Sequence, residues 1–188
     1  MGRWEPGAGG RLREAALDLY LERGFEQTMV ADIAERAGVT ARTFFRHFAD
    51  KREVLFEASA ELEQRSVAAL EAAPATASTL DLVAAALDAV VDVIGHDREF
   101  ARKRHAVIMA NPGLRERELI KLADLSAVVA DGLRRRGIEE VEAGLAAEAG
   151  SAVYRVAFQR WADAADGLDL HEAIRQSFAQ LRSLTAAG

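Results

Sequence analysis

The sequence predicts an all-α protein of about nine helices. Alanine and leucine dominate its apolar residues and runs of β-branched residues are short, a balance that favours helix over strand. Only 3 of the 188 residues are proline. Apolar side chains recur through most of the chain at the three- and four-residue spacing of a single helix face.

The first helix is expected from Arg11 to Arg23. Gly24 follows it, and glycine can end a helix in the left-handed conformation without a Cβ penalty. The apolar residues of this segment fall at the spacing of one buried face: Leu12, Ala15, Ala16, Leu19 and Tyr20.

Two short helices should follow, Met29 to Ala37 and Thr40 to Phe48, separated by Gly38 and Val39. Asp50 and Glu53 have the spacing of a capping box, so a longer helix is expected from there to about Ala72. A small, polar segment with one proline, residues 72–79, is the clearest linker. Five more helices are predicted beyond it: Leu80 to Ile94, Asp97 to Met109, Pro112 to Arg136, Val141 to Ala164 and Leu170 to Thr185.

The net charge of −6 is unevenly distributed. Residues 1–56 hold nine basic and nine acidic residues, whereas residues 57–188 hold fifteen basic and twenty-one acidic ones. Within the first part, Gly38 to Arg52 carries a local charge of +3. Screening removes the influence of charges more than about 10 Å away, so a phosphate backbone would meet this local patch.

Residues 33–48, IAERAGVTARTFFRHF, have the features of a helix-turn-helix. Ala34 is small where the two helices would cross, and Gly38 suits a turn with positive φ. Apolar residues would lock the second helix onto the first. Its remaining face would display groups that donate to phosphates or to base edges: Thr40, Arg42, Thr43, Arg46 and His47.

Residues 11–56 resemble the TetR family of regulators, whose signature spans the first helix, the motif and the start of the next helix. The resemblance implies an all-helical homodimer that binds double-stranded operator DNA and releases it when a small inducer binds. It implies an HTH DNA-binding domain over residues 1–56 and a ligand-binding and dimerisation domain over residues 57–188. We therefore expect a ligand-responsive transcriptional regulator, most simply a repressor, and not an enzyme.

The family's DNA contacts can be placed on matching positions only. Arg42 and Thr43 would meet bases, and Thr40 would cap the recognition helix near a phosphate. His47 and Lys51 match phosphate-contacting positions, whereas Phe45 lacks the hydroxyl of the tyrosine usual there. Methionine at position 29 cannot cap a helix as the usual threonine does, so Thr28 is expected to take over that role one residue earlier.

The C-terminal part offers a dimer interface and a ligand site. Residues 141–164 are rich in small residues, and with residues 170–185 they resemble the helix pair that joins two subunits in this family; packing within one chain is the alternative. Residues 102–136 resemble a subgroup that recognises acyl-CoA-like molecules. A mainly apolar ligand is expected among the following residues, with Arg104 or His105 anchoring a polar end: Val90, Ile94, Arg104, His105, Met109, Tyr154 and Phe158.

Several of these residues have another interpretation. Burial inside a helical core is the favoured interpretation of His105, and core or dimer packing is that of Tyr154 and Phe158. A DNA-binding protein without a ligand is a second possibility, although about 130 residues after the motif exceed what dimerisation needs. His96-Asp97 also occurs in all-helical HD phosphohydrolases, but the other histidines do not recur at ligand spacing, and Asp97 suits a helix N-cap.

No segment reaches the roughly 20 apolar residues of a membrane span, and the first ten residues do not form a signal peptide. A chain without cysteine cannot form disulfides or thiolate metal sites. We expect no cofactor, no metal site and no membrane partner. A cytoplasmic protein is the expectation.

Overall fold

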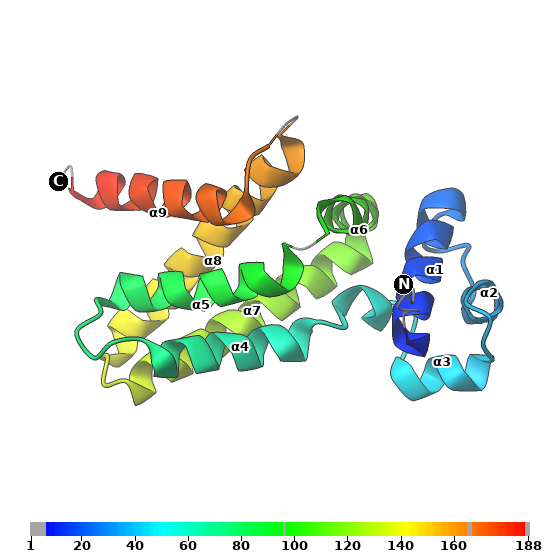
Figure 1. The fold of residues 1–188 in the computed structure, drawn as a ribbon, viewed down its shortest axis with the longest axis horizontal. Helices are drawn as coiled ribbons and strands as arrows, with labels where there is room; N and C mark the ends of the chain where they lie inside the picture. The colour runs from blue at the N-terminus through cyan, green and yellow to red at the C-terminus, as the bar shows by residue number, and fades with distance from the viewer. Residues whose placement is uncertain (1–6, 96, 165–166, 187–188) are drawn as a thin grey trace, which may run out of the picture. The chain divides into compact units, whose positions relative to one another are not determined.

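The computed structural model describes residues 7–95, 97–164 and 167–186, which form nine α-helices, one short 3-10 helix and no strand (Figure 1). The predicted fold class is confirmed. Within these residues no helix is both long enough and apolar enough to cross a membrane. The elements in chain order are α1 (Ala8–Arg23), α2 (Val30–Arg36), α3 (Ala41–His47), η1 (Glu53–Phe56), α4 (Ser59–Ala72), α5 (Thr79–Ile94), α6 (Arg98–Ala110), α7 (Pro112–Arg135), α8 (Glu140–Asp163) and α9 (Leu170–Ala186).

Short polar side chains fix the starts of several helices. Asp97 accepts a hydrogen bond of 2.9 Å from the backbone N–H three residues later, at the start of α6. Asp169 does the same for α9 at 3.3 Å, and Ser78 for α5 at 3.3 Å. These side chains satisfy donors that have no partner within the helix, and the cap predicted at Asp97 is confirmed.

The predicted single helix from Asp50 to Ala72 is wrong in one respect, because the chain forms η1 and then begins α4 as a separate helix. Val54, Leu55 and Phe56 are three consecutive residues, and all are buried. All three belong to the buried residues of unit 1, and the chain takes the tighter 3-10 conformation over them before α4 starts.

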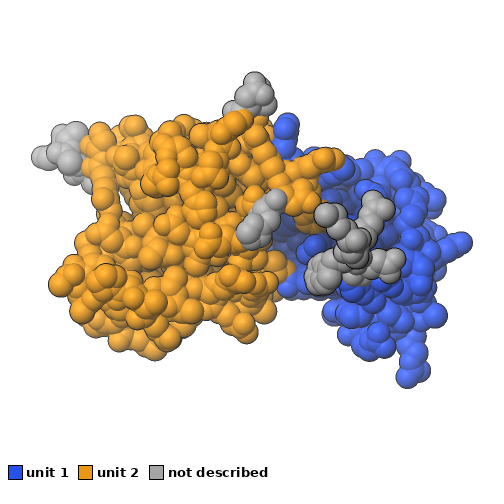
Figure 2. Space-filling view, viewed as in Figure 1, with its two compact units in different colours: residues 1–57, 102–118 blue, residues 58–101, 119–188 orange. Residues whose placement is uncertain are grey.

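The chain divides into two compact units (Figure 2). Unit 1 contains residues 1–57 and 102–118, and unit 2 contains residues 58–101 and 119–188. Residues 102–118 thus group with the N-terminal part of the chain, which the sequence did not suggest. The division of function at residues 56 and 57 stays a prediction.

In unit 1, α1 packs against α2, α3 and η1. The face predicted for the first helix is the buried one, and its leucines meet apolar side chains of α2, α3 and η1 in a common core. The most deeply buried of these residues are Leu12, Leu19, Ile33, Phe44 and Val54.

In unit 2, α5 contacts α4, α8 and α9, and α8 contacts α9. Part of the small-residue content of α8 serves this packing, since Ala143, Ala146 and Ala147 are buried in the core of the unit. At Gly150 a Cβ atom would lie 2.5 Å from a methyl carbon of Val83, a distance that side chains do not adopt. Glycine at this position therefore permits the close approach of α8 to α5.

Candidate DNA interface and ligand pocket

The turn between α2 and α3 has the geometry that the sequence predicts. Gly38 has a φ of +67°, a conformation that residues with a Cβ rarely adopt. Ala34 is 2% exposed where the two helices meet. Thr40 begins α3, and its hydroxyl accepts a hydrogen bond of 3.2 Å from the backbone N–H of Thr43. The two short helices therefore form a helix-turn-helix.

One face of α3 is anchored and the other is open. Phe44 is fully buried, and Phe48, which follows the last turn, is 4% exposed. The side chains of Arg42, Arg46 and His47 are exposed on the remaining surface. A cationic face is thus held rigidly by the aromatic anchors of the opposite face.

Two further predicted contact residues lie beside this face. Thr43 is half-buried, and its hydroxyl oxygen lies 3.1 Å from that of Thr40. Phe45 is 58% exposed and stacks edge-on against Phe44, with 5.4 Å between ring centroids. Phe45 therefore presents an aromatic surface beside the cationic face of α3.

The ammonium group of Lys51 is hydrogen-bonded within unit 1. Its ammonium group donates to the backbone carbonyl oxygens of Phe25 at 2.7 Å, Thr28 at 3.1 Å and Glu26 at 3.3 Å. It also lies 4.4 Å from the centroid of the Phe25 ring, within the range of a cation–π interaction. All three of its N–H donors are thus matched by carbonyl oxygens of the connection between α1 and α2.

Tyr20 of α1 also contacts Lys51 and the connection between α1 and α2. Its phenol donates a hydrogen bond of 2.5 Å to the backbone carbonyl oxygen of Lys51, and its ring packs edge-on against Phe25. Burial raises the pKa of the Tyr20 phenol, and the negative charge of Asp50 raises it further. The phenol therefore remains a protonated donor and ties α1 to the segment that follows α3.

The expectation that Thr28 caps α2 and contacts DNA is wrong. Met29 is the residue before the helix, and its backbone N–H donates to the Asp32 carboxylate at 3.1 Å. Thr28 is only 1% exposed, and its hydroxyl lies 2.9 Å from the carbonyl oxygen of Gly24. The hydroxyl is thus used at the end of α1, where it satisfies a backbone acceptor left open by the helix terminus.

Two arginines bind η1 to the other helices of unit 1. Arg104 of α6 donates through Nε to the carbonyl oxygen of Leu55 at 2.6 Å, and its guanidinium pairs with Glu118 through bonds of 3.2 and 2.7 Å. Arg117 of α7 donates to Glu53 at 2.9 Å. Both ion pairs are largely shielded from solvent. They therefore stabilise the fold more than an exposed ion pair would.

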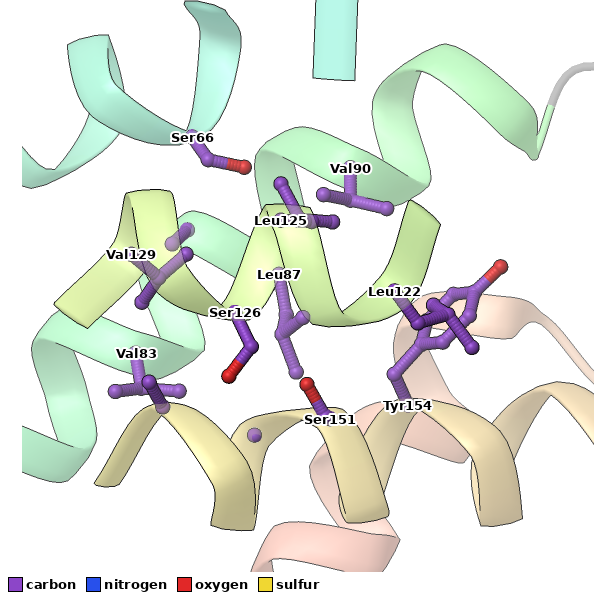
Figure 3. Close-up of a pocket in the computed structure, with 13 residues that line it drawn as sticks. Ser66, Val83, Leu87, Val90, Leu122, Leu125, Ser126, Val129, Ser151 and Tyr154 are labelled. Carbon is purple, nitrogen blue, oxygen red and sulfur yellow. The ribbon is translucent and has the colours of Figure 1, made fainter. Parts of the chain in front are cut away.

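Unit 2 contains a pocket with an empty space of about 360 Å³, part of it open to solvent (Figure 3). Its lining comes from α4, α5, α7 and α8. Four of the lining residues carry hydroxyl groups, namely Ser66, Ser126, Ser151 and Tyr154. The others are hydrocarbon or glycine: Val83, Ala86, Leu87, Val90, Leu122, Leu125, Val129, Ala147 and Gly150.

Of the seven residues predicted to bind a ligand, Val90 and Tyr154 line this pocket. Phe158 lies in the core next to Tyr154, with 5.8 Å between ring centroids, and Ile94 packs against the same core. Neither these two nor the remaining three predicted residues line the pocket. Arg104 and half-buried His105 belong to unit 1 with exposed Met109.

The sequence did not predict that α7 lines the pocket. Leu122, Leu125 and Val129 recur at three- and four-residue spacing, which marks one helix face, but the same spacing would equally suit a core helix. Ser66 and Ser126 were missed because a serine within a helix gives no sign of what its side chain faces. Only the packing of helices distant in sequence brings these residues together.

An apolar stripe remains uncovered on α8. Val141, Leu145 and Val156 lie on one face of this helix and are 65%, 68% and 56% exposed. Leu184 of α9 is 69% exposed. These residues lie within the range predicted to form a dimer interface, and large exposed apolar side chains gathered in this way mark interaction surfaces.

The alternative of a histidine–aspartate metal site gains no support. His96 lies outside the described residues, and Asp97 serves as the cap of α6. In the part of the chain that the structure describes, no group of three or more histidine, aspartate, glutamate or cysteine side chains has the geometry to hold a metal ion.

Two family models match the chain. Residues 12–58 match "Bacterial regulatory proteins, tetR family", and residues 77–186 match "MftR C-terminal domain". The first match covers the helix-turn-helix, and the second covers α5, α7 and α8 of the pocket but not α4.

The chain is also similar to named regulators. It is 34% identical to the HTH-type transcriptional regulator TcmR of Streptomyces glaucescens over 168 residues, which are 89% of this chain and 64% of TcmR. It is 42% identical over 48 residues to the HTH-type transcriptional repressor KstR2 of Mycobacterium tuberculosis, 26% of this chain and 24% of KstR2. The chain thus spans less than two thirds of the length of either relative.

Among solved structures, the FadR regulator of Bacillus subtilis in complex with stearoyl-CoA resembles the fold with a TM-score of 0.62. The match covers 92% of this chain and 96% of that one at 20% sequence identity. At this identity the likeness concerns the arrangement of helices.

Proposed function

This chain belongs to the TetR family of bacterial regulatory proteins, and from this premise we propose that it is a ligand-responsive transcriptional regulator, most simply a repressor. It binds operator DNA through α3 and leaves the operator when a small, mainly apolar molecule binds among the helices of unit 2. The observation that carries the proposal is the exposed cationic face of α3, held in place by buried Phe44 and Phe48.

In this proposal α3 enters the major groove. Arg42 and Thr43 read base edges, since arginine donates to guanine and threonine to several bases. Arg46, His47 and the exposed edge of Phe45 lie along the flanking backbone, and Thr40 holds the helix start near a phosphate. The local charge of +3 over residues 38–52 supports this assignment, because phosphate contacts supply much of the affinity of such proteins.

A single short helix offers few base contacts, so the protein acts as a homodimer. The exposed stripe of α8, with Leu184 of α9, is the surface for the second copy of the chain. A two-fold symmetric dimer brings the same patch together from both subunits, and an apolar stripe along one helix is suited to meet itself. The small residues elsewhere on α8 are used for packing within the chain.

The pocket of unit 2 is the proposed inducer site. Its lining is mainly hydrocarbon, and ligand pockets in proteins are typically of this kind, with a few polar groups that orient the ligand. An acyl-CoA-like inducer, which the sequence of residues 102–136 suggests, is one candidate for its occupant.

One helix, α7, contributes residues both to the pocket lining and to unit 1. Leu122, Leu125 and Val129 of α7 line the pocket, and Arg117 and Glu118 of the same helix pair with Glu53 and Arg104. A ligand that shifts α7 would therefore shift the pairs that hold η1, directly after the helix-turn-helix. The resulting change in operator affinity cannot exceed the ligand's differential affinity for the two states.

The proposal is tested by selecting an operator from random duplex DNA with the full chain and then measuring affinity by fluorescence anisotropy. Arg42→Ala should lose about 1–3 kcal/mol on the selected operator and discriminate less at one base pair. The control is Arg175→Ala, which removes an exposed arginine of α9 that pairs with Glu172. Selection of no sequence over random DNA, or equal losses in both variants, would contradict the proposed function.

A further inference from the structure

Among the described residues, no charged side chain lines the pocket of unit 2. Its four polar lining residues are three serines and one tyrosine, and the remaining nine are hydrocarbon or glycine. A carboxylate or phosphate buried among such groups would lose its hydration and find no cation to replace it. The lining is therefore suited to an uncharged molecule.

Ser66 is the lining residue whose hydroxyl is buried without a hydrogen-bond partner. It is completely buried, and its hydroxyl oxygen has no hydrogen-bond partner in the described part of the chain. A serine within a helix can bond back to a carbonyl oxygen of the preceding turn, but this one does not. Figure 3 shows the hydroxyl directed towards Leu125 and Val90, into apolar surroundings.

The other buried serine of the lining already has a hydrogen-bond partner. Ser126 donates a hydrogen bond of 2.8 Å to the carboxylate of Glu148. Buried polar groups without a partner are rare and destabilising, because they have lost their hydrogen bonds to water without forming others. Ser66 is thus a buried polar group of the lining to which a molecule in the pocket can supply a partner.

Resting on the proposed function, we infer that the ligand of this pocket is an uncharged, mainly apolar molecule with a carbonyl or hydroxyl oxygen that hydrogen-bonds to Ser66. Ser66 belongs to α4, so this bond joins the ligand to a helix other than α7. Arg104, which the sequence suggested as an anchor for an anionic end, donates instead to Leu55 and Glu118 within unit 1. An anionic acyl compound is the alternative that the experiment separates.

The test uses matched eight-carbon probes and the full chain without DNA. The neutral probes are 1-octanol and 2-octanone, and the anionic probes are octanoate and octanoyl-CoA, each titrated at pH 7 by calorimetry. The neutral probes should bind at least about tenfold more tightly than octanoate, because its carboxylate would be buried without a partner. The neutral probes should also exceed octanoyl-CoA.

Two serine variants then test the hydrogen bond. Ser66→Ala should bind both neutral probes about 3- to 10-fold more weakly. It should not lower the melting temperature of the empty protein, since it removes a hydroxyl that has no partner. Ser177→Ala is the matched control: Ser177 is also buried with an unpartnered hydroxyl oxygen, but it does not line the pocket. It should leave the affinity for both neutral probes unchanged.

The inference is overturned if neither neutral probe binds, if either anionic probe binds more tightly than both neutral ones, or if Ser66→Ala changes affinity no more than Ser177→Ala. A fall in the melting temperature of empty Ser66→Ala also overturns it, because the hydroxyl would then have a structural partner. Operator release is measured separately. Neutral probes that bind through Ser66 without weakening operator binding would uphold this inference while contradicting the ligand response of the proposed function.

Discussion

The ammonium group of Lys51 donates to three backbone carbonyl oxygens in the connection between α1 and α2. The sequence alone suggests a different role, because a lysine at this position of the family is expected to contact a phosphate. A cation with three satisfied donors holds the backbone of the helix-turn-helix unit in place. Its contribution is therefore expected in stability more than in the salt dependence of DNA binding.

We predict that Lys51→Ala lowers the free energy of unfolding by about 1–3 kcal/mol, since it removes hydrogen bonds to a charged donor. The measurement is urea denaturation followed by circular dichroism. Arg52→Ala is the control, because its exposed ion pair with Asp50 should contribute little. If Lys51→Ala instead left stability unchanged and reduced the slope of log K against log salt by about 2 per dimer, Lys51 would be a phosphate contact.

The roles of some single residues could be predicted from the sequence, and those of others could not. The turn at Gly38 and the cap at Thr40 follow from local chemistry, and the structure has both. Thr28 and Arg104 have partners far along the chain or in another element. Their local sequence carries no trace of those partners, so their roles could not be predicted.

At the scale of elements, α8 has two faces with different uses. Its buried small residues pack inside unit 2, and Gly150 lets α8 approach α5 closely. The opposite stripe of Val141, Leu145 and Val156 is exposed. A helix with two opposite apolar faces can pack in the core of its own subunit through one face and bind a second subunit through the other.

We predict that Leu145→Glu converts the dimer to a monomer. Leu145 is 68% exposed within one chain, so the substitution should leave the fold of the monomer intact while placing like charges opposite each other in the dimer. Sedimentation equilibrium at micromolar concentration measures the mass. A variant that adds the same charge at an exposed position of α4, Gln64→Glu, should remain dimeric, and a wild-type protein that is itself monomeric would contradict the interface.

Helix positions were predictable because the apolar spacing persists over many residues. The last five helices begin and end within about two residues of their predicted limits. The exception is the helix expected from Asp50 to Ala72. There the chain forms a short 3-10 helix before α4, a break that the local pattern of apolar residues does not indicate.

At the scale of the whole molecule, α7 belongs to both units along its length. Residues 112–118 group with the helix-turn-helix, and the rest of the helix groups with the pocket. The ion pairs of Arg117 with Glu53 and of Arg104 with Glu118 fasten the first part. These pairs are the proposed route by which events in the pocket reach DNA binding, and such a route needs evidence of energetic coupling.

We predict that Arg117→Ala leaves the affinity for 1-octanol unchanged but reduces the loss of operator affinity that 1-octanol causes, by about 2- to 30-fold. Glu53→Gln should have the same effect, and the double variant should add little, because both remove one interaction. Operator anisotropy with and without 1-octanol gives the coupling. The control is Arg115→Ala, an exposed arginine of the same helix. Equal release in all variants would place the coupling elsewhere.

The claim that two copies of α3 read one operator is tested most directly by a hydroxyl-radical footprint of the wild-type protein on its selected operator. The account predicts two protected half-sites whose centres are about 34 Å apart along the duplex, or a simple multiple of that distance, related by two-fold symmetry. Arg42→Ala should weaken protection in both half-sites equally. A single protected half-site, or protection spread evenly over the duplex, would contradict it.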